Sequence, residues 1–402
     1  MSKAKVFFGS VQHGVARGFA SFGAKVDKVI DSLDLSTIEK GDKVVIKMHL
    51  GFTDGYQTIP VFFIRKIVEK IKKAGGIPFI TDNPESVYNA YKRGYTQETC
   101  GCPLVPITGI KDGYKVEKEV DYKTVKNLFM GGVLQDADVL FDVAHIKGHN
   151  SCGFGGQVKN LGLGGFAAQS RWGTIHGVHQ KIPYWHADKC SPEHAQALVD
   201  SCPYKAITYK KEEHKLRLSF DSCYNTNCNM CLEVDKEAKT LFFGQEHFSA
   251  FSELQAIATK HVLDSFDKKK RFFISFAIEM TPVCDCYGIG QPVIINDIGI
   301  FASRDIVAVE HAVLDAIKKE GLMEKNIPPY FKHVNLDPSV DLHPFQRIHG
   351  GMKSPYMAPD FLNTMFEGEY TNEYELIELL SPEETATMKA PQSFEGKEPS
   401  FY

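Results

Sequence analysis

The sequence predicts an α/β protein whose body is built on a parallel sheet and is interrupted by a small α+β insert. Short strand-like runs alternate with amphipathic helical patterns along most of the chain. Residues 185–245 break this alternation, because they hold five of the ten cysteines and read as strands and turns. The alternation then resumes. We therefore divide the chain into the first part of the body (1–184), the insert (185–245), the second part of the body (246–350) and an extended C-terminal tail (351–402).

A β-α-β unit opens the body. Residues 43–50, KVVIKMHL, form a strand-like run, and residues 60–74 begin with proline and carry apolar residues at helical spacing. The pair Gly75-Gly76 ends the helix, and IPFITD follows as a buried strand. Such a unit implies parallel strands joined by a right-handed crossover. Asp82 ends the second strand, at the edge of the sheet where ligands usually bind.

Three later segments continue the pattern of a Rossmann-like body. Residues 134–144 read as the end of a helix and then a strand. Residues 292–300, PVIINDIGI, predict another strand, and residues 304–319 predict an amphipathic helix capped by Asp305. Asp297 lies near the end of the predicted strand, so it is a candidate for contact with a cofactor.

Composition excludes several classes of partner. The chain has 402 residues, a formal net charge of −4 and no apolar run long enough to cross a membrane. We expect neither nucleic acid nor a membrane as a partner. The N-terminus lacks a signal-peptide pattern, so we expect a cytoplasmic protein with reduced thiols. Its cysteines are then expected to ligate metals or take part in catalysis.

The cysteines of the insert carry the strongest motif. Cys202-Pro203 before a short strand resembles the closing half of a bacterial ferredoxin motif, and Cys223-x4-Cys228-x2-Cys231 resembles the opening half of the next one. In two-cluster ferredoxins the fourth cysteine of one run ligates the other cluster. The resemblance implies a ferredoxin-like insert in which Cys202, Cys223, Cys228 and Cys231 bind one 4Fe–4S cluster. Zinc in a tetrahedral site and a metal-free fold stay open as alternatives.

The motif departs from the ferredoxin pattern. The spacing between Cys223 and Cys228 holds two extra residues, and Asp235 stands where a further cysteine is expected. Only Cys190 remains before Cys202 in the first run. We therefore expect a second cluster to be absent, and a role for Cys190 stays open.

A glycine-rich stretch over residues 149–165, HNSCGFGGQVKNLGLGG, follows the strand that ends near residue 144. Lys159 can act as a point charge or as a nucleophile, and His149 can exchange protons, so both are candidate catalytic residues. Glycines let backbone N–H groups approach a ligand closely. The candidate cofactor-binding residues of the stretch are Gly153, Gly155, Gly156, Asn160 and Cys152. The alternative is that these glycines serve packing only.

A second thiol motif, CDCYG, lies at residues 284–288 after a buried strand. In an extended Cys-x-Cys both thiols point the same way, so Cys284 and Cys286 can bind a soft metal or exchange with a disulfide. They can equally be two small buried hydrophobic residues. Cys100 and Cys102 form a similar pair, whose function stays open.

Together these motifs resemble domain-of-unknown-function family 362, in the branch that carries an inserted ferredoxin module. The resemblance rests on GHNSCGFGGQVKNLGLGG, on CDCYG, on NDIGIFASRDIVAVEHA at residues 296–312, and on KMHLGFTDGYQ near residue 50. It covers roughly residues 1–320. The family name implies no activity.

The pattern His149-x3-Gly153-Phe-Gly-Gly-x2-Lys159 also resembles the core of the lactate racemase family, whose members bind a nickel pincer cofactor. This resemblance implies that Lys159 lies where the cofactor-bearing lysine lies. It places His149 where the catalytic base lies and His176 near the metal-binding histidine. We infer a shared architecture and site location, without a shared cofactor.

Three functions follow as hypotheses. The first is an iron–sulfur redox enzyme or electron-transfer protein of anaerobic metabolism, with a redox partner protein or a small-molecule substrate. Its substrate or metal-cofactor site would be the glycine-rich loop, and a second metal or cofactor is expected there. The second is a non-redox, racemase-like enzyme with a structural cluster. The third is a carrier of a metal or a cluster.

Overall fold

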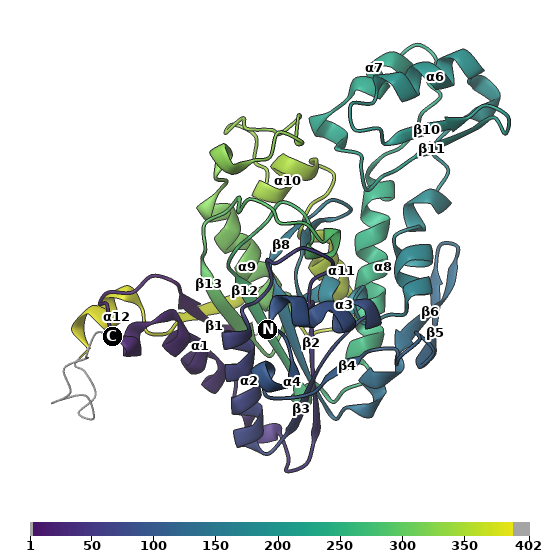
Figure 1. Ribbon diagram of the computed structural model, residues 1–402. Helices are drawn as coiled ribbons and strands as arrows, with labels where there is room; N and C mark the ends of the chain where they lie inside the picture. The colour runs from purple at the N-terminus through teal and green to yellow at the C-terminus, as the bar shows by residue number, and fades with distance from the viewer. Residues whose placement is uncertain (1–2, 389–402) are drawn as a thin grey trace.

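The body contains an eight-stranded, mostly parallel sheet with helices on both faces (Figure 1). The computed structural model describes residues 3–388. The strand order is β14-β1-β13-β12-β7-β2-β3-β4, and β13 alone runs antiparallel to its two neighbours. The predicted α/β class is therefore confirmed. The strands are β1 (Ala4–Ser10), β2 (Lys43–Met48), β3 (Ile77–Asp82), β4 (Leu104–Pro106), β7 (Val139–His145), β12 (Arg271–Ala277), β13 (Gly299–Ser303) and β14 (Tyr374–Glu378).

Alternating side chains of the central strands build two separate cores. Val45 and Phe273 belong to the core on one face, whereas their neighbours Val44 and Phe272 belong to the core on the other. This follows from the period of two residues in a strand. Helices α5 (Gln157–Gly162), α8 (Gln245–Leu263), α9 (Ile306–Glu320) and α11 (Met357–Thr364) contribute to the first core, and α1 (Phe22–Asp31) and α2 (Val61–Ala74) contribute to the second.

The first β-α-β unit forms as predicted. Strands β2 and β3 pair in parallel, and α2 ends at Gly75, whose φ of 103° closes the helix. After β2, the next two strands of the sheet, β3 and β4, lie on one side of β2. The later strands β7 and β12 lie on its other side. The sheet therefore has its topological switch point between β2 and β7, where a crevice opens at the carboxyl ends of the strands.

The glycine-rich stretch forms a small hairpin and a short helix beyond β7. Strands β8 (Lys147–His149) and β9 (Gly153–Gly155) pair antiparallel, and α5 follows directly. The N-terminus of helix α5 contacts the carboxyl group of Glu310, whose Oε1 accepts hydrogen bonds from the backbone N–H groups of Gln157 and Val158. This contact with α9 fixes the stretch above the carboxyl end of the sheet.

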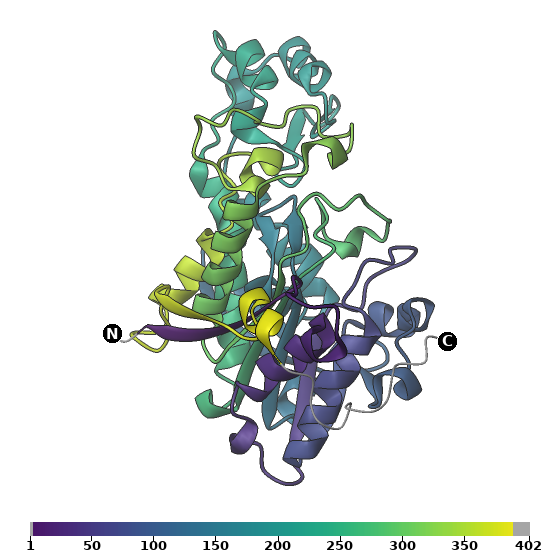
Figure 2. The ribbon, with the colours of Figure 1, turned by 90° about the vertical axis from the view of Figure 1, so that its left-hand side faces the viewer.

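The insert protrudes from the body at the N-terminal end of α8 in both ribbon views (Figures 1 and 2). It contains helix α6 (Pro192–Ser201), the hairpin β10 (Ile207–Lys210) and β11 (Lys215–Leu218), and helix α7 (Met230–Asp235). Its own small core includes Cys190 and Cys223 together with aliphatic and aromatic residues. A ferredoxin-like fold for this unit stays a prediction.

Two segments differ from the sequence-based expectation. Residues 292–298 form a loop with one bridge, Met280–Ile295, and the predicted strand begins only at Gly299. The described part of the expected extended tail, residues 351–388, contains α11, α12 (Pro382–Thr387) and β14, which pairs in parallel with β1. Residues 389–402 of that tail lie outside the described residues. Within residues 3–388, none of the helices has the length and apolarity needed to span a bilayer.

Candidate active site

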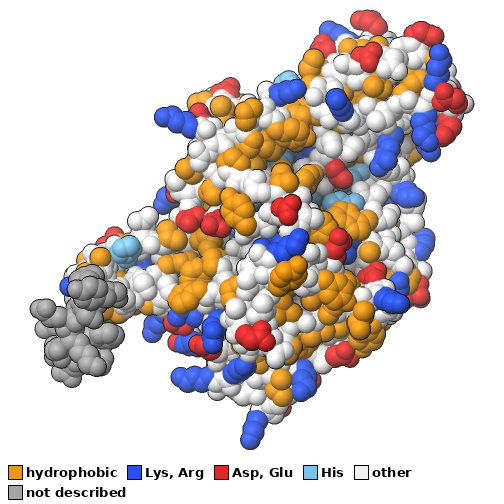
Figure 3. Space-filling view, in the orientation of Figure 1, with side chains coloured by type: hydrophobic (Ala, Val, Ile, Leu, Met, Phe, Trp, Pro, Cys, Tyr) orange, Lys and Arg blue, Asp and Glu red, His pale blue; other side chains and the backbone are white. Residues whose placement is uncertain are grey.

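A cavity of about 150 Å³ opens at the switch point, beside the carboxyl ends of β2, β3 and β7. The face shown in Figure 3 has a recess with histidine side chains inside it, where the insert meets the body. Four lysine and arginine side chains line the cavity: Lys47, Lys147, Lys159 and Arg171. Its polar and aromatic lining includes Lys47, His49, Asp82, Asn83, Glu85, His145, Lys147, Lys159, Asn160, Arg171, Trp172 and Cys286.

One buried carboxylate holds a lysine and a histidine from the end of β2. Asp82 lies 3.3 Å from Lys47 Nζ and 2.9 Å from His49 Nδ1, and it also accepts the backbone N–H of Leu50. Although burial opposes it, the charges of Lys47 and His49 hold the pKa of Asp82 well below its usual value. Asp82 is therefore an ionised positioning group at the predicted edge of the sheet.

A second carboxylate makes the same arrangement at the end of β7. Asp285, from the CDC motif, lies 2.9 Å from His145 Nδ1 and 2.8 Å from Lys147 Nζ. Burial opposes its ionisation, but these two neighbours hold the pKa of Asp285 below its usual value. Both ring nitrogens of His145 have partners, because its Nε2 also contacts the carbonyl oxygen of Ile278 at 2.9 Å.

Asn160 connects α5 to β2 and β7. Its amide donates to the backbone oxygen of Lys47 at 2.9 Å and to the carboxyl of Asp142 at 2.6 Å, and its oxygen accepts from Lys47 Nζ at 3.0 Å. Burial raises the pKa of Asp142 well above its usual value, although Asn160 and Lys47 oppose the shift. Asn160 thus orients Lys47 and lines the cavity itself.

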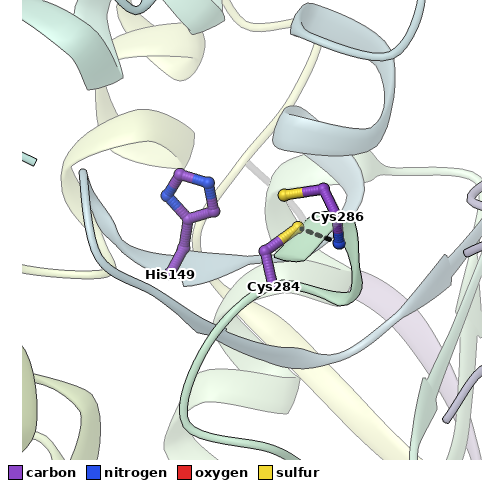
Figure 4. Close-up of side chains that lie close together, drawn as sticks. All are labelled: His149, Cys284 and Cys286. Atoms are coloured by element: carbon purple, nitrogen blue, oxygen red, sulfur yellow. Dashed lines mark hydrogen bonds between the residues drawn. The ribbon is translucent and has the colours of Figure 1, made fainter. Parts of the chain in front are cut away.

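The centre of the site is a contact between Lys159 and the CDC motif. Lys159 Nζ donates to Cys284 Sγ at 3.1 Å. Cys284 Sγ also accepts the backbone N–H of Cys286 at 3.3 Å (Figure 4). The motif forms a 3-10 turn over Asp285–Tyr287, not the extended strand that the sequence suggested. The two thiols still meet, because Cys284 caps the turn.

Electrostatics favour a thiolate at Cys284. Burial acts against it, but the contacts with Cys286 and with the Lys159 ammonium hold the pKa of Cys284 well below its usual value. The pKa of Cys286 lies above its usual value because of its contact with Cys284 and its burial. Burial opposes the charge on Lys159, yet the neighbouring thiols raise its pKa. A charged Lys159 fits the role of a point charge, and its role as a nucleophile stays a prediction.

His149 completes a candidate metal site. One ligand atom from each of His149, Cys284 and Cys286 lies within 4.8 Å of the others, and Figure 4 shows the three side chains turned toward one another. Burial and the Lys159 charge lower the pKa of His149 well below its usual value, so its imidazole is neutral. Cys152 Sγ lies 3.4 Å from His149 Nδ1 and adds a third thiol beside the group.

Two predicted glycines make room for the protein itself. Gly153 has a φ of +82°, and a Cβ there would lie 2.3 Å from the carbonyl oxygen of Lys353. A Cβ on Gly156 would lie 2.4 Å from the Glu310 carboxylate. Gly155 and Gly156 also line the cavity. Close packing therefore explains a glycine at positions 153 and 156, and contact of Gly153, Gly155 and Gly156 with a ligand stays a prediction.

The four cysteines predicted to bind a cluster lie in the insert. Burial raises the pKa of Cys231 to about 12, and the thiols of the other three add to the shift. Cys202, Cys223 and Cys231 all pack in the small core of the insert. The backbone N–H of Ala206 donates to Cys202 Sγ at 3.2 Å. Among the described residues, His149, Cys284 and Cys286 are the one group of three or more ligands within 4.8 Å, and no three insert cysteines are that close.

Lys353 connects the insert to the glycine-rich stretch. Its buried ammonium donates to the backbone oxygens of Cys223 at 2.6 Å and of Asn150 at 2.5 Å. Beside it, Asp221 lies 3.7 Å from His176 Nδ1 and 3.4 Å from His179 Nε2. A few polar contacts therefore join the cysteine insert to the glycine-rich stretch.

Several site residues escape sequence reasoning. The predicted site residues did not include Lys47, His49, Lys147, Arg171 or Asp285. The available signal was that KMH and HIK place basic residues at the ends of two predicted strands. The structure does not bring Asp297 to this cavity, because its carboxylate accepts the backbone N–H of Glu279 at 2.6 Å in a separate surface depression.

The fold and the site define an α/β protein with a cavity at its switch point, beside which a lysine contacts a thiol. Residues 44–315, more than half of the chain, match the family described as "Domain of unknown function (DUF362)". The chain belongs to this family, and the predicted membership is confirmed.

Two solved structures are similar to parts of the chain. A Thermotoga maritima protein from a structural genomics consortium is 11% identical with a TM-score of 0.33, over 65% of this chain and 52% of that one. The lactate racemase apoprotein from Thermoanaerobacterium thermosaccharolyticum is 14% identical with a TM-score of 0.35, over 79% of this chain and 58% of that one. The chain thus spans little more than half the length of either. With TM-scores below 0.5, neither likeness defines a function. No curated protein matches the chain.

Proposed function

We propose that this protein is an iron–sulfur redox enzyme that acts on a small molecule bound in the switch-point cavity. The observation that carries the proposal is the 3.1 Å contact between Lys159 Nζ and Cys284 Sγ, with Cys286 and His149 within 4.8 Å. A stabilised thiolate, a second thiol and a neutral imidazole are ligands that soft transition metals prefer. Lys159 would balance the negative charge of the thiolate.

The insert supports a second centre. Four cysteine thiolates are the donor set of a 4Fe–4S cluster, and Cys202, Cys223 and Cys231 pack in one small core. Backbone N–H groups that donate to cysteine sulfur, as Ala206 does to Cys202, tune such clusters. Such a cluster, when bound, transfers one electron at a time. Cys202, Cys223, Cys228 and Cys231 would hold it, as the ferredoxin resemblance implies.

The contacts of Lys353 support electron transfer between the two centres. Its ammonium contacts both Cys223 of the insert and Asn150, which is adjacent to His149. The backbone carbonyl of Lys353 also approaches Gly153 closely. In this proposal the residue holds the insert against the glycine-rich stretch, and its positive charge stabilises a reduced centre beside it.

A second candidate is proton transfer on a 2-hydroxy acid without net redox change, with the cluster structural. His49 favours it, because Asp82 orients its Nδ1 while its buried Nε2 has no hydrogen-bond partner among the described residues. Burial opposes protonation, but Asp82 raises the pKa of His49, which suits an acid–base group. This enzyme would interconvert the acid's stereoisomers equally well in oxidised and reduced protein, and K159A would abolish that activity.

Metal analysis of three matched variants tests the main proposal. Protein purified without oxygen is expected to contain about four irons and equal acid-labile sulfide per chain. C228A should lose both, and C284A should keep the insert's iron while losing a redox reaction at the cavity. C102A makes the same change in a buried cysteine of the second core, and its iron and sulfide content should match that of the wild type. Wild-type protein without iron and sulfide would refute the proposal.

A further inference from the structure

We infer that the ligand of the cavity is a small molecule carrying an oxyanion, a carboxylate or a phosphate, which pairs with Arg171. The inference rests on the proposed function only for the location of the site. It concerns binding, which does not require a metal, a cluster or a redox reaction.

The lysines of the cavity already have anionic partners in the protein. Lys47 is 3.3 Å from Asp82, and Lys147 is 2.8 Å from Asp285. Lys159 contacts the sulfur of Cys284. An incoming anion would have to compete with each of these internal contacts, so the lysines are poor anchors for it.

Arg171 is the exception among the basic lining residues. None of the described acids lies within 4.0 Å of its guanidinium, and its Nε is buried without a hydrogen-bond partner. A guanidinium nitrogen that is buried without a partner is costly, whereas a bidentate pair with a carboxylate or phosphate satisfies the group. Arg171 lies in η5, a π-helix over Gln169–Ile175, and such helices often occur at functional sites.

The acids nearest to Arg171 are engaged elsewhere or exposed. Asp82 is held by Lys47 and His49, and Asp112 accepts from Thr108 at 2.5 Å and from the backbone N–H of Ala168 at 3.1 Å. Glu85 lines the cavity but is exposed to solvent. An oxyanion from a ligand therefore fits the guanidinium better than any described acid does.

The size of the cavity limits the ligand. A volume of about 150 Å³ is smaller than the roughly 300–1,000 Å³ of sites for drug-sized compounds. A short carboxylic acid or a small phosphate compound fits, and a dinucleotide does not. Trp172, which is adjacent to Arg171 and 58% exposed, lines the same cavity.

Isothermal titration calorimetry on the protein as purified without oxygen tests the inference. The probes are acetate, malonate and inorganic phosphate, and malonamide is the neutral counterpart of malonate. At least one anion should bind to the wild type, and R171Q should weaken that binding tenfold or more. R171K, which keeps the charge without the planar fork, should lie between them. R65Q, at an exposed arginine of α2 paired with Glu69, should bind like the wild type.

Each outcome is decisive. Selective binding of malonate and acetate assigns a carboxylate, and selective binding of phosphate assigns a phosphate compound. The inference is overturned if the wild type binds none of the anions, if malonamide binds as tightly as malonate, or if folded R171Q binds as the wild type does. Iron and sulfide content of the same preparations reports on the proposed function separately, so the two can fail independently.

Discussion

The ammonium of Lys159 lies 3.1 Å from the sulfur of Cys284, although the two residues are 125 positions apart in the chain. The contact joins the glycine-rich stretch to the CDC motif at the carboxyl edge of the sheet. In this contact the ammonium of Lys159 and the thiolate of Cys284 stabilise each other's charge. The predictions below test this pair and the groups around it.

Replacing Lys159 should raise the pKa of the Cys284 thiol. The ammonium stabilises the thiolate, so in K159M that pKa should return toward the usual value of about 8.5. Ultraviolet thiolate absorbance against pH, on chelator-treated and reduced protein, measures the shift. K181M changes an exposed lysine and should leave the curve unchanged, and C284A should remove the low-pH transition. Identical curves for K159M and wild type would show that Lys159 does not stabilise a thiolate.

Asp285 should matter for stability as well as for the site. D285N leaves the ammonium of Lys147 buried without a counter-charge, and breaking one side of such a pair costs about 3–5 kcal/mol. Urea unfolding of the metal-free protein measures the loss. D121N, which breaks the exposed contact with Lys126, should change stability little. Equal effects of the two substitutions would contradict the role given to Asp285.

Glu310 should make stability fall as the pH rises. Burial raises the pKa of Glu310 to about 8 from an ordinary value of 4.5, so between these values the folded protein binds a proton that the unfolded chain has lost. The free energy of unfolding should therefore decrease across this range, by up to about 1.4 kcal/mol per pH unit. E310Q should flatten the dependence, and E324Q, at an exposed glutamate, should not. A slope that E310Q leaves intact would assign the effect to other groups.

Gly153 should tolerate no side chain. G153A places a Cβ against the Lys353 carbonyl at a positive φ, so we expect a loss of about 2 kcal/mol or more. The separation of the insert from the glycine-rich stretch should appear as faster hydrogen exchange near Lys353. G113A is the control, because a Cβ there meets no atom within 4 Å. Unchanged stability and exchange in G153A would contradict the tight packing described here.

Local patterns predicted the parts of the fold that are local. The β-α-β unit of residues 43–82 was predicted from its periodicity and from the helix end at Gly75. The position of Asp82 at the carboxyl end of its strand was predicted with it. The strand expected at residues 292–300 begins only at Gly299, because apolar spacing does not show where pairing partners are found.

The site itself depends on contacts between distant segments. Asp82 and Asp285 each hold one lysine and one histidine, and nothing in the spacing of KMH, HIK and CDC indicates which carboxylate pairs with which strand end. The contacts of Lys353 with both Asn150 and Cys223 could not be predicted either, because Lys353 lies in a stretch without periodicity. Pairing of this kind appears only once the sheet order is known.

X-ray anomalous scattering from crystals grown without oxygen tests the central claim most directly. The account predicts iron among Cys202, Cys223, Cys228 and Cys231, and a transition metal bound by Cys284, Cys286 and His149. Crystals of metal-replete wild-type protein with no anomalous peak at either position would contradict it.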